Sequence, residues 1–409
     1  MKNGKQIITA IDIGTSKICV VTASFDEDNN LEILGIGESK SLGIKKGIVV
    51  NINDTVDGIK KAILDAENQS GKKINDCFIG ISGEHIRGIN NTGVIMVQNV
   101  NQEIDHNDIN RVLKHAQTIT LPLERRILHV LSQDFKVDDQ SGIKDPIGMI
   151  GNRLETKVHL VTSEKTLEKN IISCIERSDI NLNDIILNPL ATSYSVLDQN
   201  EKDLGIALID IGAGTTEVIV FAEGGVQHTG VIPLGGNNIT LDIAHGVQTT
   251  IENAEKLKCK YGIAKEALAN PDELINIKDI NNNEFRNLNQ KELASFIEPR
   301  MEEILLLAKS EIKKCGQGDI FTFGIKLTGG TSRLKNSIDL ANNIFFQPVK
   351  VGKPRLKGGI SANLNCPTYS TVVGLLKFAI KNHKEDSLKD NFSIKNFINS
   401  IKNLFKDIY

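Results

Sequence analysis

Two short glycine-rich turns carry residue types suited to binding phosphate. The first, DIGTSK, begins at Asp12, and the second, DIGAGTT, begins at Asp210. Glycine lets backbone N–H groups approach an anion, and hydroxyl or ammonium groups add further donors. Two such turns facing each other would hold one polyphosphate from both sides. The residues with these properties are Gly14, Thr15, Ser16 and Lys17 in the first turn and Gly212, Gly214, Thr215 and Thr216 in the second.

Asp12 and Asp210 end the apolar runs that precede the two turns. Because Mg²⁺ keeps much of its hydration shell and binds few carboxylates, we expect both to hold Mg²⁺ through water. One such turn alone is more often a plain hairpin, but its recurrence after 198 residues indicates a unit used twice. The sequence G-x-x-x-x-G-K-[ST] does not occur, which excludes a P-loop site.

The first half of the chain predicts a sheet interrupted by an insert. Strands are expected at 6–12, 18–25, 31–37 and 77–82, with a helix at 53–69 that buries Val56, Ile59, Ile63 and Leu64. Residues 84–162 differ, because a strand at 94–97, a helix at 109–116 and long strands at 127–137 and 155–162 predict a small α+β insert. Ser163 is then expected to cap a helix, and a strand follows at 185–187.

The second half repeats the strand, turn and strand pattern over residues 205–226. Helical sequence follows at 237–262 and 290–316, and a strand at 325–328 leads into a glycine pair and another helix. A core helix is expected at 369–380. The charged stretch 382–391 predicts a flexible linker, and the last 17 residues a separate element. These patterns predict an α/β protein.

Composition sets limits on the class of protein. The 409 residues suggest two or three domains, and 48 basic against 51 acidic side chains disfavour a dedicated nucleic-acid binder. The six cysteines lack C-x-x-C spacing, so buried free thiols are expected rather than zinc ligands or disulfides. Asp12 interrupts the N-terminal apolar run and no run reaches 18 apolar residues, so a cytoplasmic protein is expected.

Three segments are similar, in the expected order, to the phosphate-one, phosphate-two and adenosine motifs of the actin-like ATPases: Ile11–Lys17, Leu208–Thr216 and Leu327–Ser332. Over essentially the whole chain, the stretches VHLVTSEKTLEKNI, NPLATSYSVL, IEPRMEEIL and YSTVVGLL resemble the FtsA family of bacterial cell-division proteins. The resemblance implies an actin-like (duplicated ribonuclease-H-like) two-lobed nucleotide-binding fold. It also implies an FtsA-type 1C α+β insert, a C-terminal amphipathic helix, and ATP and Mg²⁺ as cofactors.

The same resemblance implies a division into subdomains. Subdomain 1A would comprise residues 1–83 and 163–195, and subdomain 1C would comprise 84–162. Subdomain 2A would comprise 196–234 and 309–381, subdomain 2B 235–308, the linker 382–392 and the membrane-targeting helix 393–409.

The second lobe carries further residues expected at the nucleotide. Gly235, Gly236 and Asn237 open a helix whose N-terminal amides could contact phosphates or ribose. Glu255 and Lys258 match the nucleoside-contacting helix of the family, although taken alone they would be a solvated helical face. The resemblance places four residues at the border of the adenine: Gly329, Gly330, Thr331 and Arg333.

Hydrolysis is expected to be slow or undetectable. Related chaperones and MreB carry a Glu-Pro segment whose carboxylate helps position the attacking water, whereas this chain has Asn188 before Pro189. An amide cannot act as a general base. We therefore expect ATP to act chiefly as a conformational or polymer-stabilising ligand.

The C-terminal segment SIKNFINSIKNLFKDIY predicts an amphipathic helix at a membrane surface. Docking of this helix on the core of the protein is the alternative. Lys395, Lys402 and Lys406 lie off the apolar stripe, where they can meet anionic lipid head groups. The stripe itself consists of Ile394, Phe397, Ile398, Ile401, Leu404, Phe405 and Ile408.

The resemblance also implies partners and a location. FtsA proteins tether FtsZ to the inner face of the cytoplasmic membrane at the division site, form filaments with themselves, and recruit later division proteins through 1C. Arg300 is the position most readily tied to the FtsZ C-terminal peptide, with an ordinary surface salt bridge as the alternative. The alternative interpretations of the sequence are a PilM-like scaffold of type IV pilus assembly, MreB, and a sugar kinase or chaperone ATPase.

Overall fold

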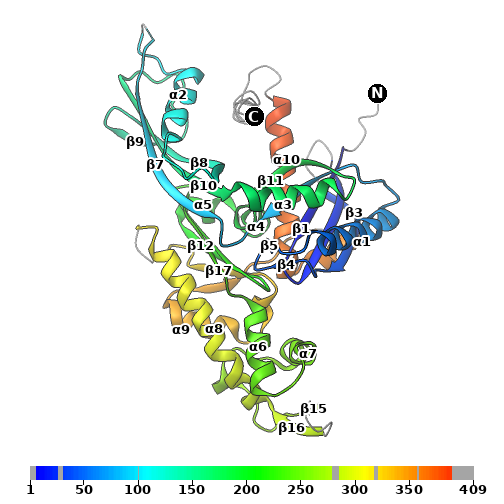
Figure 1. The fold of residues 1–409 in the computed structure, drawn as a ribbon. Helices are drawn as coiled ribbons and strands as arrows, with labels where there is room; N and C mark the ends of the chain where they lie inside the picture. Colours follow the sequence, from blue (N-terminus) through cyan, green and yellow to red (C-terminus); the bar gives the residue numbers. More distant parts are fainter. Residues whose placement is uncertain are drawn as a thin grey trace.

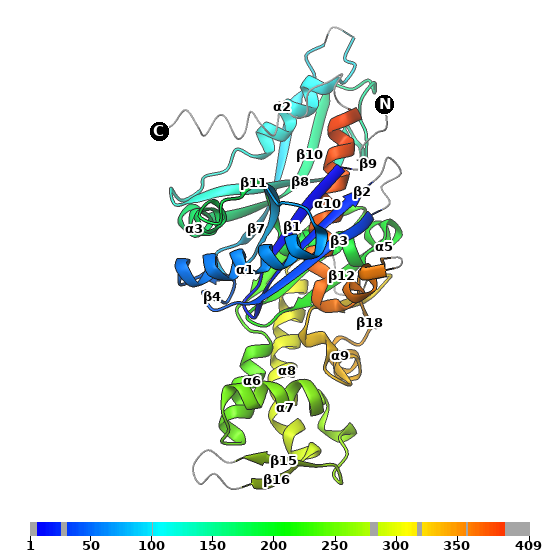
Figure 2. The ribbon, with the colours of Figure 1, turned by 90° about the vertical axis from the view of Figure 1, so that its right-hand side faces the viewer.

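The structure is a computed structural model that describes residues 6–25, 31–99, 101–278, 285–316, 321–356 and 359–388. Two five-stranded sheets form the centres of two lobes, and a four-stranded sheet belongs to the insert (Figure 1). The molecule is long in the side view (Figure 2). Helix α2 (His106–Ala116) of the insert lies towards one end, and the hairpin β15 (Leu274–Lys278) and β16 (Phe285–Asn289) lies at the other. The predicted α/β class with two sheet-rich lobes is confirmed.

The first lobe is built on a sheet with the strand order β11-β6-β1-β2-β3. Helix α1 (Ile52–Ser70) begins where the Asn51 side chain accepts a hydrogen bond from the Asp54 amide, and it packs on β3. Its close approach requires glycine, because a Cβ on Gly37 would lie 1.8 Å from the Ala62 carbonyl oxygen. The other elements are β1 (Gln6–Ile13), β2 (Lys17–Phe25), β3 (Leu31–Lys40), β4 (Ile44–Lys45), β5 (Ile48–Val49), β6 (Asp76–Ile81), α3 (Lys165–Glu176) and β11 (Asn181–Leu187).

The second lobe repeats this arrangement with the strand order β14-β13-β12-β17-β18. As β1 pairs antiparallel with β2 and parallel with β6, so β12 pairs antiparallel with β13 and parallel with β17. Its elements are α5 (Gln199–Leu204), β12 (Ile206–Ile211), β13 (Thr216–Ala222), β14 (Gly225–Ile232), α6 (Gly236–Gly246), α7 (Ile251–Tyr261), η1 (Glu266–Leu268), α8 (Gln290–Lys313), β17 (Ile325–Thr328), η2 (Thr331–Arg333), α9 (Ser337–Phe345) and β18 (Val349–Val351).

The insert has a small core of its own. Its sheet has the order β7-β10-β8-β9, and α2 packs on β7 and β10. Val112 of α2 and Leu154 of β10 are fully buried there, and strands β7 and β8 also contact β14 of the second lobe. The predicted α+β insert is confirmed. Its strands are β7 (Arg87–Met96), β8 (Arg125–Val137), β9 (Gln140–Ile143) and β10 (Arg153–Glu164).

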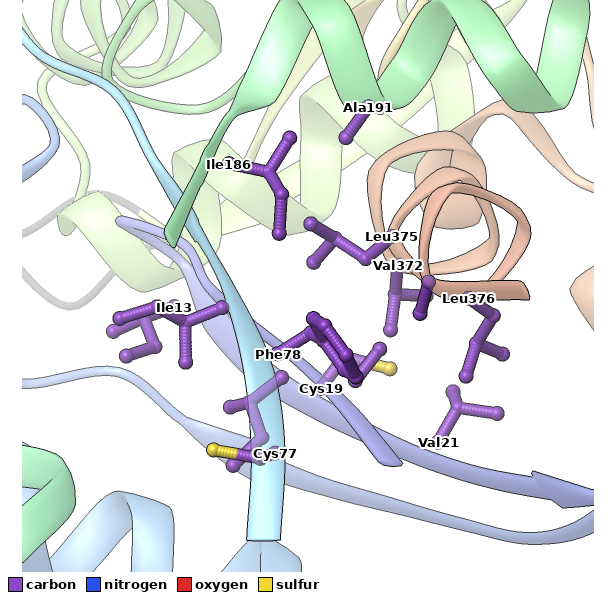
Figure 3. Close-up of a cluster of buried hydrophobic side chains, with 14 of the residues drawn as sticks. Ile13, Cys19, Val21, Cys77, Phe78, Ile186, Ala191, Val372, Leu375 and Leu376 are labelled. Carbon is purple, nitrogen blue, oxygen red and sulfur yellow. The ribbon is translucent and has the colours of Figure 1, made fainter. Parts of the chain in front are cut away.

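Two helices join the halves of the molecule. Helix α4 (Asn188–Val196) and helix α10 (Ser370–Leu388) pack on each other, and α10 also covers β1, β2 and β6. Figure 3 shows the resulting apolar layer, in which Val372 and Leu376 of α10 lie near Cys19 of β2. Helix α10 is preceded by the short helices η3 (Gly359–Leu364) and η4 (Pro367–Tyr369).

Three local expectations were wrong. Ser163 lies within β10 and caps nothing; α3 begins after Glu164, and the buried Ser163 hydroxyl donates to the Glu168 carboxylate at 3.2 Å. Leu64 on α1 is 56% exposed, because it lies at the edge of the apolar stripe. Helix α10 runs to Leu388 and therefore covers part of the expected linker 382–392, since polar sequence indicates exposure rather than loss of helix.

The described residues bear on two further expectations. The six cysteines form no disulfide within the described ranges; Cys19, Cys77 and Cys174 are buried, but Cys259 is exposed. No helix in the described ranges is long and apolar enough to span a bilayer. The expected amphipathic helix at 393–409 lies outside the described residues.

Candidate functional site

The two glycine-rich turns have the same backbone geometry. The Gly14 amide donates to the Lys17 carbonyl at 3.0 Å, and the Gly212 amide donates to the Thr215 carbonyl at 2.9 Å. The turns also face each other, because a Cβ on Gly214 would lie 2.5 Å from Thr15 Oγ1. The duplication inferred from the sequence therefore places one turn from each lobe against the other.

A cleft of about 410 Å³ lies at this junction. That volume is within the range of small-molecule and cofactor sites. The cleft brings together most of the predicted nucleotide-binding residues, from both halves of the chain. They are Asp12, Gly14, Thr15, Ser16, Lys17, Asp210, Gly212, Gly214, Thr215, Gly236, Glu255, Lys258, Gly329, Gly330, Thr331 and Arg333.

Three predicted residues do not line the cleft. The Thr216 hydroxyl is buried and donates to the Leu234 carbonyl at 2.9 Å. The amide of Gly235 donates to Asn238 Oδ1, and the amide of Asn237 donates to the Ala213 carbonyl. The Gly236 amide is likewise taken by Gly212. The Gly236 and Asn237 amides thus connect α6 to the second turn, and the Gly235 amide bonds to α6 itself, so the expected phosphate or ribose contacts of these amides are not available here.

Asp12 and Asp210, which directly precede the two turns in the sequence, both line the cleft. Burial raises the pKa of each to about 6, and their mutual repulsion adds to the shift at Asp12. A divalent cation would favour both ionised forms, so this pair fits the expected Mg²⁺ held through water. Asp210 is fixed in place by Thr192 of α4, whose hydroxyl donates to it at 3.0 Å, with Thr371 of α10 at 3.4 Å.

Lys17 is held at the side of the first turn. Its ammonium pairs with Glu38 at 2.6 Å and lies 3.7 Å from the centre of the Tyr369 ring. A cation fixed between a carboxylate and an aromatic face has lost much of its side-chain freedom. Glu38 and Tyr369 thus hold the Lys17 ammonium in one position at the cleft.

The expected nucleoside side of the cleft is an ordered polar network. Lys258 is buried; its ammonium donates to Thr240 Oγ1 at 2.7 Å and to the Gly236 carbonyl at 2.9 Å, and it pairs with Glu255 at 2.6 Å. Thr331 Oγ1 donates to the Gly212 carbonyl at 2.9 Å, which joins the adenosine motif to the second turn. Lys258 is therefore not part of a solvated face, whereas Glu255 remains 45% exposed at the cleft.

Sequence reasoning missed several polar residues of the cleft. Glu217, Ser82 and Thr371 line it but were not predicted as site residues. Glu217 could have been predicted from the strand pairing of the hairpin, because this residue lies directly opposite Asp210 in the β12–β13 ladder. Asn188 also lines the cleft, and its shielded side-chain oxygen has no hydrogen-bond partner among the residues that the structure describes.

Arg300 lies on α8 and does not line the cleft. Its guanidinium forms a bidentate pair with Asp242 of α6, at 2.6 Å from Nε to Oδ2 and 3.1 Å from Nη2 to Oδ1, and it also contacts Glu303. The Asp242 hydrogen bond raises the pKa of Arg300. An acidic partner would have to compete with Asp242 for this side chain.

The family models and two similar known proteins all relate this chain to one family. Residues 207–374 match the family described as cell division protein FtsA, and residues 83–162 match the SHS2 domain inserted in FtsA. The chain is 40% identical to FtsA of Pseudomonas aeruginosa over 385 residues, covering 94% of this chain and 92% of that protein. It is 38% identical to FtsA of Bacillus subtilis over 392 residues, covering 96% and 88%.

Solved structures show the same fold at low identity. A chain of the PilM–PilN type IV pilus biogenesis complex superposes with a TM-score of 0.65 at 14% identity, covering 91% of this chain and 98% of that one. MreB5 of Spiroplasma citri bound to ADP gives 0.56 at 14% identity, covering 93% and 98%. The fold is therefore the actin-like one.

Proposed function

Because the chain belongs to the FtsA family of cell-division proteins, we propose that it is an ATP-binding adaptor that tethers FtsZ to the membrane. It would act at the inner face of the cytoplasmic membrane at the division site, polymerise there and recruit later division proteins. The observation that carries this proposal is the pair of equivalent turns facing each other across one cleft.

ATP with Mg²⁺ is the ligand that the cleft suits best. Its two turns offer amides and hydroxyls to phosphates, Asp12 and Asp210 suit a hydrated Mg²⁺, and Thr331 and Arg333 suit the nucleoside end. The similar fold of an MreB5 bound to ADP supports a nucleotide in such a cleft. With Asn188 in place of a carboxylate, we expect tight binding and slow hydrolysis.

The subdomain assignment is part of this proposal. The first lobe corresponds to 1A, the insert to 1C, residues 196–234 and 309–381 to 2A, and residues 235–308 to 2B. Helix α10 lies within 309–381 but packs on β1, β2 and β6, so its contacts favour 1A over 2A for this helix. The position of the insert beside β14 of the second lobe supports its treatment as a separate contact surface. We assign to 1C the contacts with neighbouring filament subunits and with later division proteins.

We propose that residues 393–409 anchor the protein reversibly to anionic lipids. Each lysine near an anionic surface contributes on the order of 1 kcal/mol, so one helix binds weakly and filament formation strengthens attachment through avidity. Assembly and membrane residence would then be coupled. Arg300 is proposed as a contact for the FtsZ C-terminal peptide, in exchange for Asp242.

Liposome co-sedimentation tests this function. The full chain and a chain truncated after Asn382 are mixed with anionic liposomes, MgATP and the FtsZ C-terminal peptide. Only the full chain should sediment, and it should carry the peptide with it. If the truncated chain sediments equally, or the peptide stays in solution, a scaffold resembling PilM becomes the better account.

A further inference from the structure

In the described part of the chain three lysines are buried, and one of them has no acidic partner. Lys258 pairs with Glu255, and Lys326 pairs with Glu201. The third, Lys202 on α5, is 9% exposed and forms no ion pair with any residue in the described ranges. A buried cation is costly unless an anion accompanies it, so the ammonium of Lys202 indicates a place for an external anion.

More positive charge gathers around the aromatic ring beside Lys202. The Lys202 ammonium lies 4.4 Å from the centre of the Tyr194 ring, and the ammonium of Lys381 on α10 lies 5.3 Å from it. One turn earlier on α10, burial and the nearby charge of Arg355 lower the pKa of Lys377. Among the residues that the structure describes, none of these four cations forms an ion pair. Lys202, Arg355, Lys377 and Lys381 are called the basic patch below.

The carboxylate next to Lys202 in the sequence is already occupied. Glu201 pairs with Lys326 through one oxygen and accepts from the Asp198 amide at 3.0 Å through the other. Burial, with repulsion from Lys381, lowers the pKa of Lys202 to about 8. An anion held against the patch would reverse this shift, because an opposite charge favours the ionised amine.

The basic patch lies on the helix that leads towards the proposed membrane segment. Lys381 is seven residues before the end of α10 at Leu388, which corresponds to about 10 Å of helix. From Leu388 to residue 393 the chain can span at most about 18 Å. One membrane surface can therefore contact both the patch and the segment 393–409.

We propose that the basic patch binds the phosphate of an anionic lipid headgroup, so that the body of the protein contacts the membrane as well as its tail. This rests on the membrane function proposed above. Ammonium and guanidinium groups are the usual donors to phosphate oxygens in proteins. Lys202 and Lys381 would contact the phosphate around the Tyr194 ring. Lipid is favoured over soluble phosphate because the chain carries the patch towards the proposed tail helix. Two contacts fix the orientation of the molecule at the surface, which one tail helix does not.

The first test detects contact of the body with lipid. The chain contains no tryptophan, so Tyr194→Trp in the full-length protein places a single fluorophore in the patch and keeps an aromatic face for its cations. The vesicles contain phosphatidylglycerol and a phosphatidylcholine with a nitroxide on its headgroup. Tyr261→Trp is the control, because Lys260 lies 4.8 Å from this ring on α7, towards the other end of the molecule (Figure 2). The nitroxide should quench the fluorescence of Y194W and leave that of Y261W unchanged.

The second test removes charge from the patch without changing the aromatic ring. Full-length Lys377→Gln/Lys381→Gln is compared with Lys256→Gln/Lys291→Gln, which removes two exposed lysines from the other end of the molecule. In sedimentation with vesicles of equal parts phosphatidylglycerol and phosphatidylcholine, the first pair should lower the affinity about tenfold or more, and the second less than about twofold. On vesicles of phosphatidylcholine alone, the two variants should behave alike.

Three results overturn the inference. If vesicles bind Y194W without quenching it, or if K377Q/K381Q binds like the control pair, the patch has no lipid contact, although the tail anchor stands. If inorganic phosphate or glycerophosphoglycerol shifts the emission of Y194W while vesicles do not quench it, the patch is a site for soluble phosphate. If the wild type does not bind anionic vesicles, the proposed membrane function fails first and this inference fails with it.

Discussion

His159 Nε2, on β10 of the insert, lies 2.8 Å from Thr229 Oγ1 on β14 of the second lobe. Its Nδ1 lies 2.6 Å from Asn90 Oδ1, which can only accept, so the neutral ring carries its proton on Nδ1 and accepts from Thr229 at Nε2. The Asn90 amide group also donates to the Gln227 carbonyl at 3.0 Å. The insert is joined to the first lobe at both of its ends in the sequence, yet these hydrogen bonds attach it to the second lobe.

Replacing His159 should therefore destabilise the contact between insert and second lobe. His159→Ala removes two buried hydrogen bonds and leaves Asn90 and Thr229 short of a partner, at a cost of about 2–4 kcal/mol. Urea denaturation followed by circular dichroism measures the loss. His245→Ala, at an exposed position, should change stability by less than about 0.5 kcal/mol. Equal stability of both variants would contradict the interpretation.

The same residue should make stability depend on pH. Burial, with repulsion from His228, lowers the pKa of His159 from 6.5 to about 3. The unfolded chain therefore binds the proton first, and the stabilising contribution is complete above pH 6.5 and is lost as the pH falls towards 3. Between pH 6.5 and 5.5 the wild type should lose about 1 kcal/mol more than His159→Gln. Parallel pH profiles of the two proteins would rule this out.

Gly214→Ala should disturb the contact between the two turns. The added Cβ would lie 2.5 Å from Thr15 Oγ1 and 2.8 Å from its Cγ2, which must push the turns apart. Because the turns are expected to hold one polyphosphate together, ATP affinity should fall at least about tenfold. Adding Thr15→Ala removes the two nearest atoms and leaves only the Cβ of residue 15, at 2.9 Å, so it should restore part of the affinity in a fluorescent-nucleotide titration. No loss in G214A would show that the turns act separately.

Substitutions of Arg300 and of its partner Asp242 should change the affinity for the FtsZ C-terminal peptide in opposite directions. Because Asp242 already occupies its guanidinium, Asp242→Asn should strengthen binding of the FtsZ C-terminal peptide several-fold, whereas Arg300→Ala should weaken it about tenfold. Fluorescence anisotropy measures both affinities, with Lys256→Ala on the exposed face of α7 as the control. If neither substitution changes the affinity for the peptide, Arg300 forms only an ordinary surface salt bridge.

The sequence predicted the features that repeat or alternate strongly. The turns at Asp12 and Asp210 could be placed because glycine and aspartate must occupy fixed positions, and β17 matches its expected bounds. The hairpin β15–β16 and the short strand β9 were missed. In β15 the buried Ile275 and Ile277 alternate with polar residues, but over only five residues, and β9 has a single apolar residue in four, so neither gives a long hydrophobic period.

Contacts between distant segments could not be read from the sequence. Two amides of α6 donate to the carbonyls of Gly212 and Ala213. The hydroxyls of Thr192 and Thr371, on two different helices, both donate to Asp210. Glu217 could have been found by extending the hairpin register from the turn, because each residue of β13 faces a defined partner on β12.

The most direct test of the account is whether both turns bind one nucleotide. Isothermal titration of the full-length wild type with MgATP should give one site per chain. Asp12→Asn and Asp210→Asn, in lobes that are far apart in sequence, should each lower the affinity at least about tenfold and weaken its dependence on Mg²⁺. Two independent sites, or a variant of either aspartate that binds MgATP like the wild type, would contradict the shared cleft.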